Sequence, residues 1–139
     1  MGSFLYGPLD RLFGSRKWVI IAGNLGTFAS LMALALIPNL SVISATILIT
    51  TIGIFGMSFP LMMAHGRSFI PAHVMGRGVA MLNLCSISGV GILQSVSASA
   101  YQWGAVQSVA TGYQSLFLFF AIPLAIASII YMFIQDRLD

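Results

Sequence analysis

Four long stretches of the chain contain no charged residue, and this feature limits the possible folds more than any other. They cover residues 18–37, 41–64, 78–101 and 115–134, and each is 20 to 24 residues long. A helix of that length extends roughly 30 to 36 Å, which is enough to cross a hydrocarbon core about 30 Å thick. The alternation typical of a membrane-crossing strand is missing, for example at residues 117–120, FLFF. The sequence therefore predicts an all-α integral membrane protein with four transmembrane helices.

The composition agrees with this prediction. Of the 139 residues, 58% are hydrophobic and only 6% are charged, whereas a soluble domain has about 25% charged residues. Six Lys and Arg spread over the whole chain do not form the dense basic face of a nucleic-acid binder. Cys85 is the only cysteine, which excludes a disulfide scaffold, and we expect it to be a small buried residue. The expected medium is a lipid bilayer, and no nucleic-acid partner is expected.

The positions of the cations predict the orientation of the helices. Lys and Arg occur only before the first stretch, between the second and third, and after the fourth: Arg11, Arg16, Lys17, Arg67, Arg77 and Arg137. Loops rich in Lys and Arg stay in the cytoplasm. We therefore expect a multi-pass protein of a bacterial inner membrane or plasma membrane. Segment 1–17 would be the end of a preceding helix followed by a cytoplasmic loop, and the tail 135–139 would also be cytoplasmic.

The segments between the stretches are expected to be loops. Residues 38–40 form a tight reversal, and residues 65–77 form a longer polar loop in which His65 and His73 are solvated. The uncharged segment 101–114 suits a loop at the membrane interface, anchored by its aromatic residues. The spacing of the two histidines matches no metal signature, so no metal is expected.

Polar side chains inside the stretches are the candidates for a binding site. On a helix, four residues of the third stretch share an arc of roughly 80°: Asn83, Ser86, Gln94 and Ser97. In the second stretch Thr50 lies on a stripe with Thr46 and Gly53, next to a bend expected at Pro60. Such faces avoid lipid and contact either a ligand or another helix. Both alternatives remain open at this stage.

The first and fourth stretches are expected to have structural roles. A stripe of small residues around Gly26 permits close packing of helices, and Asn24 is expected to hydrogen-bond to a neighbouring helix. The fourth stretch is almost wholly aliphatic and aromatic, which is typical of a lipid-facing helix. No nucleophile paired with a base, no paired carboxylates and no phosphate loop occur, so neither an enzyme nor a cofactor is expected.

Residues 7–17, GPLDRLFGSRK, resemble the signature cytoplasmic loop of the major facilitator superfamily, G-x-L-x-D-R-x-G-R-K. Both glycines keep their separation and the basic pair follows, although the Asp-Arg pair comes one residue early. In the family this loop is a gate element that braces the two halves of the transporter. The resemblance implies that role for Gly7, Asp10, Arg11, Gly14, Arg16 and Lys17.

The resemblance also implies a fold and a function. The short tail indicates spans nine to twelve of a twelve-helix bundle, with spans three to six as the alternative. The chain would then be part of a secondary transporter that moves a small solute by alternating access. It would need the missing N-terminal half as its partner and would be inactive alone. Asn83, Gln94 and Thr50 would contact the substrate, with Ser86 and Ser97 beside them. The alternative function is a four-span scaffold or assembly protein without transport activity.

Overall fold

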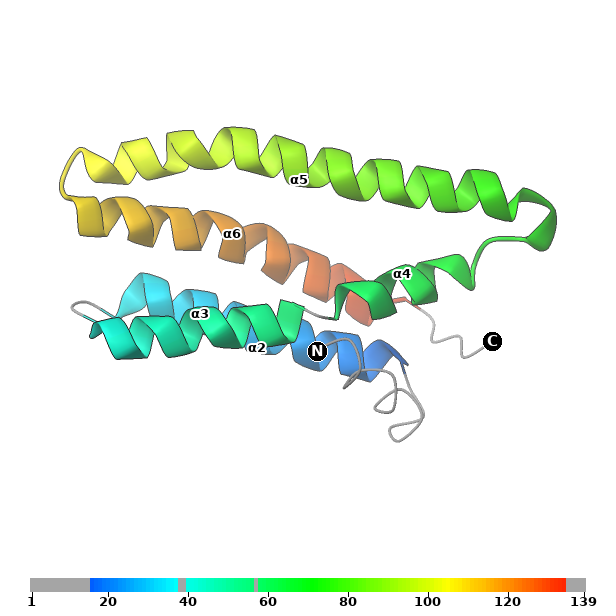
Figure 1. Ribbon diagram of the computed structural model, residues 1–139, viewed down its shortest axis with the longest axis horizontal. Coiled ribbons are helices and arrows are strands. Elements are labelled where there is room, and N and C mark those ends of the chain that lie inside the picture. Colours follow the sequence, from blue (N-terminus) through cyan, green and yellow to red (C-terminus); the bar gives the residue numbers. More distant parts are fainter. Residues whose placement is uncertain (1–15, 38–39, 57, 135–139) are drawn as a thin grey trace.

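The computed structural model describes residues 16–37, 40–56 and 58–134, which form helices and no strand. The α-helices are α2 (Arg16–Leu36), α3 (Val42–Gly56), α4 (Phe59–Arg67), α5 (Met75–Ala105) and α6 (Val109–Met132), and a 3₁₀ helix, η1 (Ala72–Val74), precedes α5 (Figure 1). Four segments are long and apolar enough to cross a membrane: Lys17–Leu36, Val42–Arg67, Ala72–Ala105 and Val109–Met132. The helical prediction is confirmed, and these four segments are typical of a multi-pass membrane protein.

The long helices run alternately up and down. The start of α2, the connection from α4 to α5 and the end of α6 lie at one end of the molecule (Figure 1). The connections from α2 to α3 and from α5 to α6 lie at the other end. Every Lys and Arg of the described residues lies at the first end, which we call the cationic end: Arg16, Lys17, Arg67 and Arg77.

Local chemistry explains where several helices begin. The hydroxyl of Ser108 accepts a hydrogen bond from the backbone N–H of Thr111 at 3.1 Å and so caps the start of α6. Ser41 does the same for Ser44 at 3.2 Å, just before α3. Pro60 lies at the first turn of α4, where a missing N–H costs little, and it cannot continue the hydrogen-bond ladder of α3. The second membrane-length segment is therefore divided into α3 and α4.

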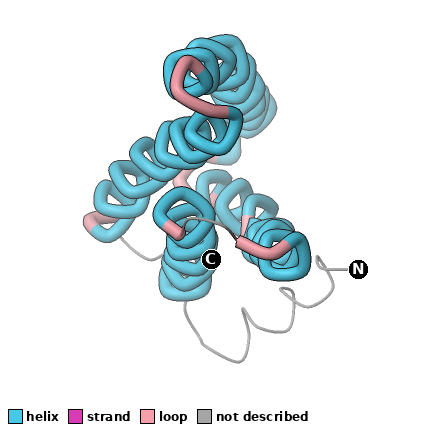
Figure 2. The backbone as a smooth tube through the Cα atoms, turned by 90° about the vertical axis from the view of Figure 1, so that its left-hand side faces the viewer, coloured by secondary structure: helices cyan, strands magenta, loops and turns pink. Residues whose placement is uncertain are grey.

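The helices pack unevenly. α2 contacts α3, α4 and α6, whereas α5 packs mainly against α6 and meets α4 only near the cationic end. In both Figure 1 and the end-on view of Figure 2, α5 lies at the edge of the molecule. The core is near the cationic end, where Ile20, Ile21 and Tyr131 pack together. α5 therefore presents most of its surface outward.

Two glycines lie where neighbouring helices approach closely. A Cβ atom on Gly26 would lie 2.6 Å from Cδ2 of Phe55, so α2 and α3 can approach only because this residue has no side chain. A Cβ atom on Gly104 would lie 2.5 Å from the backbone oxygen of Thr111. The predicted role of Gly26 in close packing is confirmed.

The sequence-based expectations for segment 101–114, for the fourth stretch and for Cys85 are wrong. The 101–114 loop is mostly helix, because α5 continues to Ala105 and the Ser108 cap starts α6 immediately afterwards. α6 is not simply lipid-facing, because it packs against both α2 and α5 and buries Ala121 and Ser128. Cys85 is exposed rather than buried, because it lies on α5, which presents most of its surface outward.

Candidate functional site

A buried histidine near the cationic end is the most unusual polar feature of the described residues. His65 is 1% exposed, although the sequence placed it in a solvated loop. Its Nδ1 atom is hydrogen-bonded to the hydroxyl group of Tyr131, which joins α4 to α6. The ring of Phe69 packs edge-on against the imidazole, with the ring centroids 5.2 Å apart. The loop expectation for His65 is therefore wrong.

The extra length of α4 explains this burial. α4 continues to Arg67, three residues beyond the predicted end of the second stretch. Leu61, His65 and Phe69 are spaced four residues apart, so they lie on the same side of the helix or its extension. Leu61 packs against the core cluster that contains Tyr131. This four-residue spacing is visible in the sequence, but the predicted second stretch ends at residue 64, one residue before His65.

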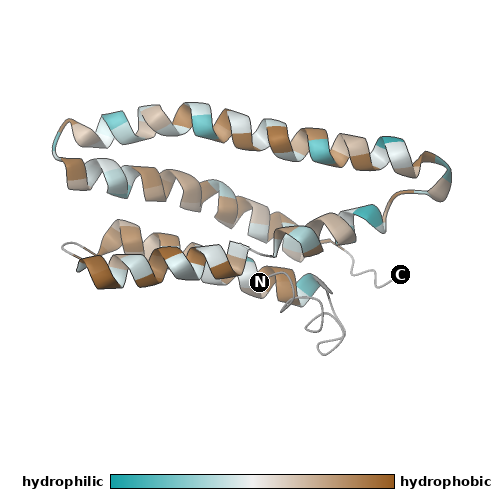
Figure 3. Ribbon diagram, in the orientation of Figure 1, coloured by the Kyte–Doolittle hydropathy of each residue, from teal (hydrophilic) through white to brown (hydrophobic). Residues whose placement is uncertain are grey.

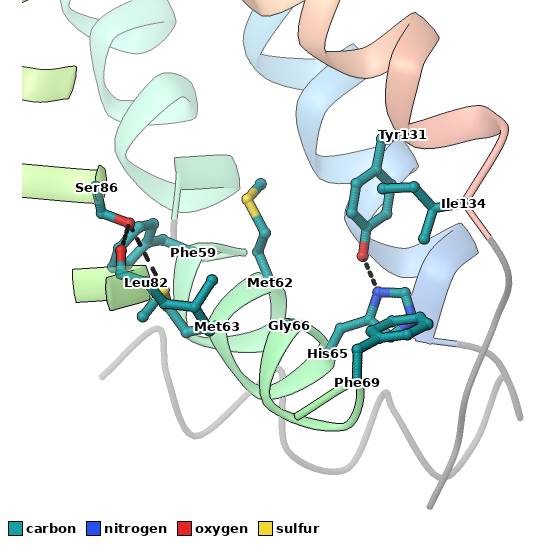
Figure 4. Close-up of a pocket in the computed structure, with 10 residues that line it drawn as sticks. All are labelled: Phe59, Met62, Met63, His65, Gly66, Phe69, Leu82, Ser86, Tyr131 and Ile134. Carbon is teal, nitrogen blue, oxygen red and sulfur yellow. Dashed lines mark hydrogen bonds between the residues drawn. The ribbon is translucent and has the colours of Figure 1, made fainter. Parts of the chain in front are cut away.

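The His65–Tyr131 pair lies beside a cavity of about 370 Å³ between α4, α5 and α6 (Figure 4). Most of its lining is apolar or aromatic, and the polar side chains are His65, Tyr131 and Ser86. The full lining is Phe59, Met62, Met63, His65, Gly66, Phe69, Leu82, Ser86, Tyr131 and Ile134. Such a cavity, apolar with a few polar groups, is typical of a small-molecule or lipid site.

Ser86 is the predicted site residue that lines this cavity. Its hydroxyl donates a hydrogen bond to the backbone oxygen of Leu82 at 2.8 Å. The same hydroxyl lies 3.8 Å from the sulfur of Met63 (Figure 4). The Ser86 hydroxyl is thus already hydrogen-bonded without a ligand.

The other predicted lining residues are not gathered in this cavity. Asn83, Gln94 and Thr50 are exposed, and Ser97 is half-buried. The hydroxyls of Thr50 and Ser97 donate to backbone oxygens of their own helices, at 2.8 Å and 2.7 Å. Figure 3 shows hydrophilic positions recurring along α5, while α3 is mostly hydrophobic. Asn83 and Gln94 on α5 therefore lie outside the described core.

Most of the predicted gate loop lies outside the described residues: Gly7, Asp10, Arg11 and Gly14. Arg16 and Lys17 form the start of α2 at the cationic end, and Lys17 is half-buried. The gate role of this loop stays a prediction. Within the described residues, no group of three His, Cys, Asp or Glu side chains could hold a metal ion.

Asn24 is buried but does not form the hydrogen bond expected of it. It is 6% exposed, and no hydrogen bond joins its side chain to a described residue. An unpaired amide in the core costs about 1–3 kcal/mol. We therefore expect Asn24→Leu, which has a similar volume, to stabilise the chain by about 1 kcal/mol in reversible unfolding measurements.

The matched change Asn24→Ala removes the amide but leaves a void. We expect it to be less stable than Asn24→Leu by about 2 kcal/mol. A loss of stability in Asn24→Leu would show that the amide has a partner, which would contradict this interpretation of the core.

Comparisons with known proteins do not add to this geometry. No protein-family model matches the sequence, and no curated protein or solved structure is significantly similar to the chain.

Proposed function

We propose that the chain is part of a secondary transporter that moves a small solute by alternating access. The observation that carries this proposal is the pair of exposed amides on α5, Asn83 and Gln94. α5 belongs to a segment long and apolar enough to cross a membrane. Amide groups in such a segment face a wet pathway or other protein, because lipid cannot hydrogen-bond to them.

The two amides lie beside the face of α5 that packs against other helices. Leu82, Ser86 and Leu93 are half-buried and mark the side of α5 that packs. Asn83 and Gln94 lie about 80 to 100° around the helix from that side. They are about 16 Å apart along the axis, so they define a polar flank rather than a single point. Leaving one amide unpaired in hydrocarbon costs roughly 4–8 kcal/mol by alkane-transfer estimates.

Two further features support the proposal. Residues 7–17 resemble the signature loop of the major facilitator superfamily, whose members are secondary transporters. The cations of the described residues gather at one end, which favours a cytoplasmic location for that end and for both termini. On this proposal the remaining helices of the transporter cover the polar flank, and the solute passes between them and α5.

Labelling of cysteines tests whether the polar flank is wet. In a Cys85→Ala background, Asn83→Cys and Gln94→Cys are compared in native membranes by their rates of reaction with a membrane-impermeant thiol reagent. The matched lipid-facing position is Ile122→Cys, an exposed residue of α6. Because thiolates form only where water is present, we expect positions 83 and 94 to react about tenfold faster than position 122.

Gln107→Cys serves as the orientation control, since Gln107 lies in the turn between α5 and α6, opposite the cationic end. It should react from outside intact cells. If positions 83 and 94 react as slowly as position 122, the flank is packed in a dry interface. That result would contradict the transport proposal and favour the scaffold alternative.

A further inference from the structure

The cavity beside His65 is part of a longer apolar groove along α5. A second cavity of about 180 Å³ shares Phe59 and Ser86 with it and continues to Val90. From Leu82 to Val90 the groove follows α5 for about 12 Å, starting near the cationic end. The groove therefore runs from near the cationic end toward the middle of α5.

The polar groups in this groove are already hydrogen-bonded. The hydroxyl of Ser86 donates to the backbone oxygen of Leu82, and His65 is bonded to Tyr131. The other side chains that line the groove are apolar, aromatic or thioether groups, and both Phe59 and Val90 are exposed at its side. An occupant of this groove thus needs a hydrocarbon surface. In a bilayer the surrounding hydrocarbon consists of lipid acyl chains.

The positive charge at the cationic end of the groove indicates which kind of headgroup the occupant has. Arg67 directly follows the lining residue Gly66 and comes one turn after Met63, on the same face of α4. Arg67 is exposed and forms no ion pair with a described residue. A guanidinium binds phosphate through two parallel hydrogen bonds. The described residues also contain no Asp or Glu, so the cationic end attracts anionic headgroups.

The geometry points to a binding site for an anionic phospholipid. One acyl chain lies in the groove between α4 and α5, and Arg67 binds the phosphate at the cationic end. On α5, Val90 lies within about 40° of Asn83 and Gln94, so this end of the groove adjoins the polar flank, whereas Leu82 and Ser86 mark the packing side. The lipid proposal does not depend on the transport proposal. The site would hold one lipid molecule at the place where α4, α5 and α6 meet.

A photoactivatable phosphatidylglycerol with a diazirine in its acyl chain tests the site. The full chain is reconstituted in vesicles of phosphatidylcholine with this probe, and the cross-linked residues are mapped by mass spectrometry. We expect cross-links at Met62, Met63 and Val90. Unlabelled phosphatidylglycerol should compete more effectively than phosphatidylcholine.

Two arginine variants distinguish headgroup binding by Arg67 from a general effect of positive surface charge. Arg67→Gln should lower the cross-linking yield in the groove about fivefold, the loss expected for one cation near the headgroups. Arg77→Gln removes a cation on the far side of α5 and should leave the yield unchanged. Since both arginines are exposed, neither change is expected to prevent folding.

A groove-filling variant, Ser86→Leu, provides the second measurement. It should abolish cross-links at Met63 while leaving those at the outer surface of α6. The proposal is overturned if phosphatidylcholine competes equally, if Arg67→Gln has no effect, or if cross-links occur only outside the groove. Slow cysteine labelling at Asn83 and Gln94 would overturn the transport proposal but not this one.

Discussion

Gly104→Val is expected to lower the free energy of unfolding by about 3 kcal/mol, the upper part of the range for overpacking. Gly104 is buried where the end of α5 contacts the start of α6. A Cβ atom there would overlap the hydroxyl of Ser115 and lie 2.5 Å from the backbone oxygen of Thr111. Because a backbone oxygen cannot rotate away, the two helices must separate. Reversible unfolding in mixed micelles, followed by the helical circular dichroism signal, measures this loss.

Gly91 provides the matched control on the same helix. A Cβ atom on Gly91 would have no neighbour within 4 Å. Gly91→Ala should therefore be neutral or stabilise the chain by up to about 1 kcal/mol, because alanine favours helix more than glycine does. Gly104→Ala, which adds only one methyl group, should still be destabilising. Equal stability of Gly104→Ala and Gly91→Ala would contradict the close contact between α5 and α6.

The four membrane-length segments of the described residues could be predicted from sequence because their length and composition follow from the medium. Only a helix pairs all its backbone groups within a single segment in hydrocarbon, so an uncharged stretch of 20 residues has one main solution. Helix ends follow other rules. The Ser108 cap is a single hydrogen bond, which hydropathy does not measure, and hydropathy likewise does not place the end of α5 at Ala105. The predicted 101–114 loop was wrong for this reason.

The packing of the helices could be predicted only in part. Gly26 indicated a close approach because its lack of a side chain is itself the physical cause. The composition of α6 could not show whether its apolar side chains contact lipid or helices, because both surroundings favour the same residues. Similarly, the arc of Asn83, Ser86, Gln94 and Ser97 identified polar positions but not their neighbours. Of these, Ser86 lines the cavity beside His65, while Asn83 and Gln94 lie on the outward flank of α5.

His65→Phe is expected to lower the free energy of unfolding by about 2 kcal/mol. The change keeps a ring at the site but removes the hydrogen bond to Tyr131 and leaves that buried hydroxyl without this partner. The loss of a buried hydrogen-bond partner costs about 1–3 kcal/mol. His73→Phe is the matched control, since His73 is exposed in η1, and it should change stability by less than about 0.5 kcal/mol. The unfolding assay used for Gly104 measures both.

A double-mutant cycle shows whether the cost comes from the pair itself. Tyr131→Phe alone should also be destabilising, because it leaves the imidazole of His65 without this hydroxyl in an apolar surrounding. The double variant His65→Phe with Tyr131→Phe replaces both polar groups by apolar rings of similar shape, which can be nearly neutral. We therefore expect the double variant to be more stable than the sum of the single changes predicts, by about 1–2 kcal/mol. If the two free-energy costs simply add, the two side chains act independently. The hydrogen bond between α4 and α6 would then not stabilise this end of the bundle.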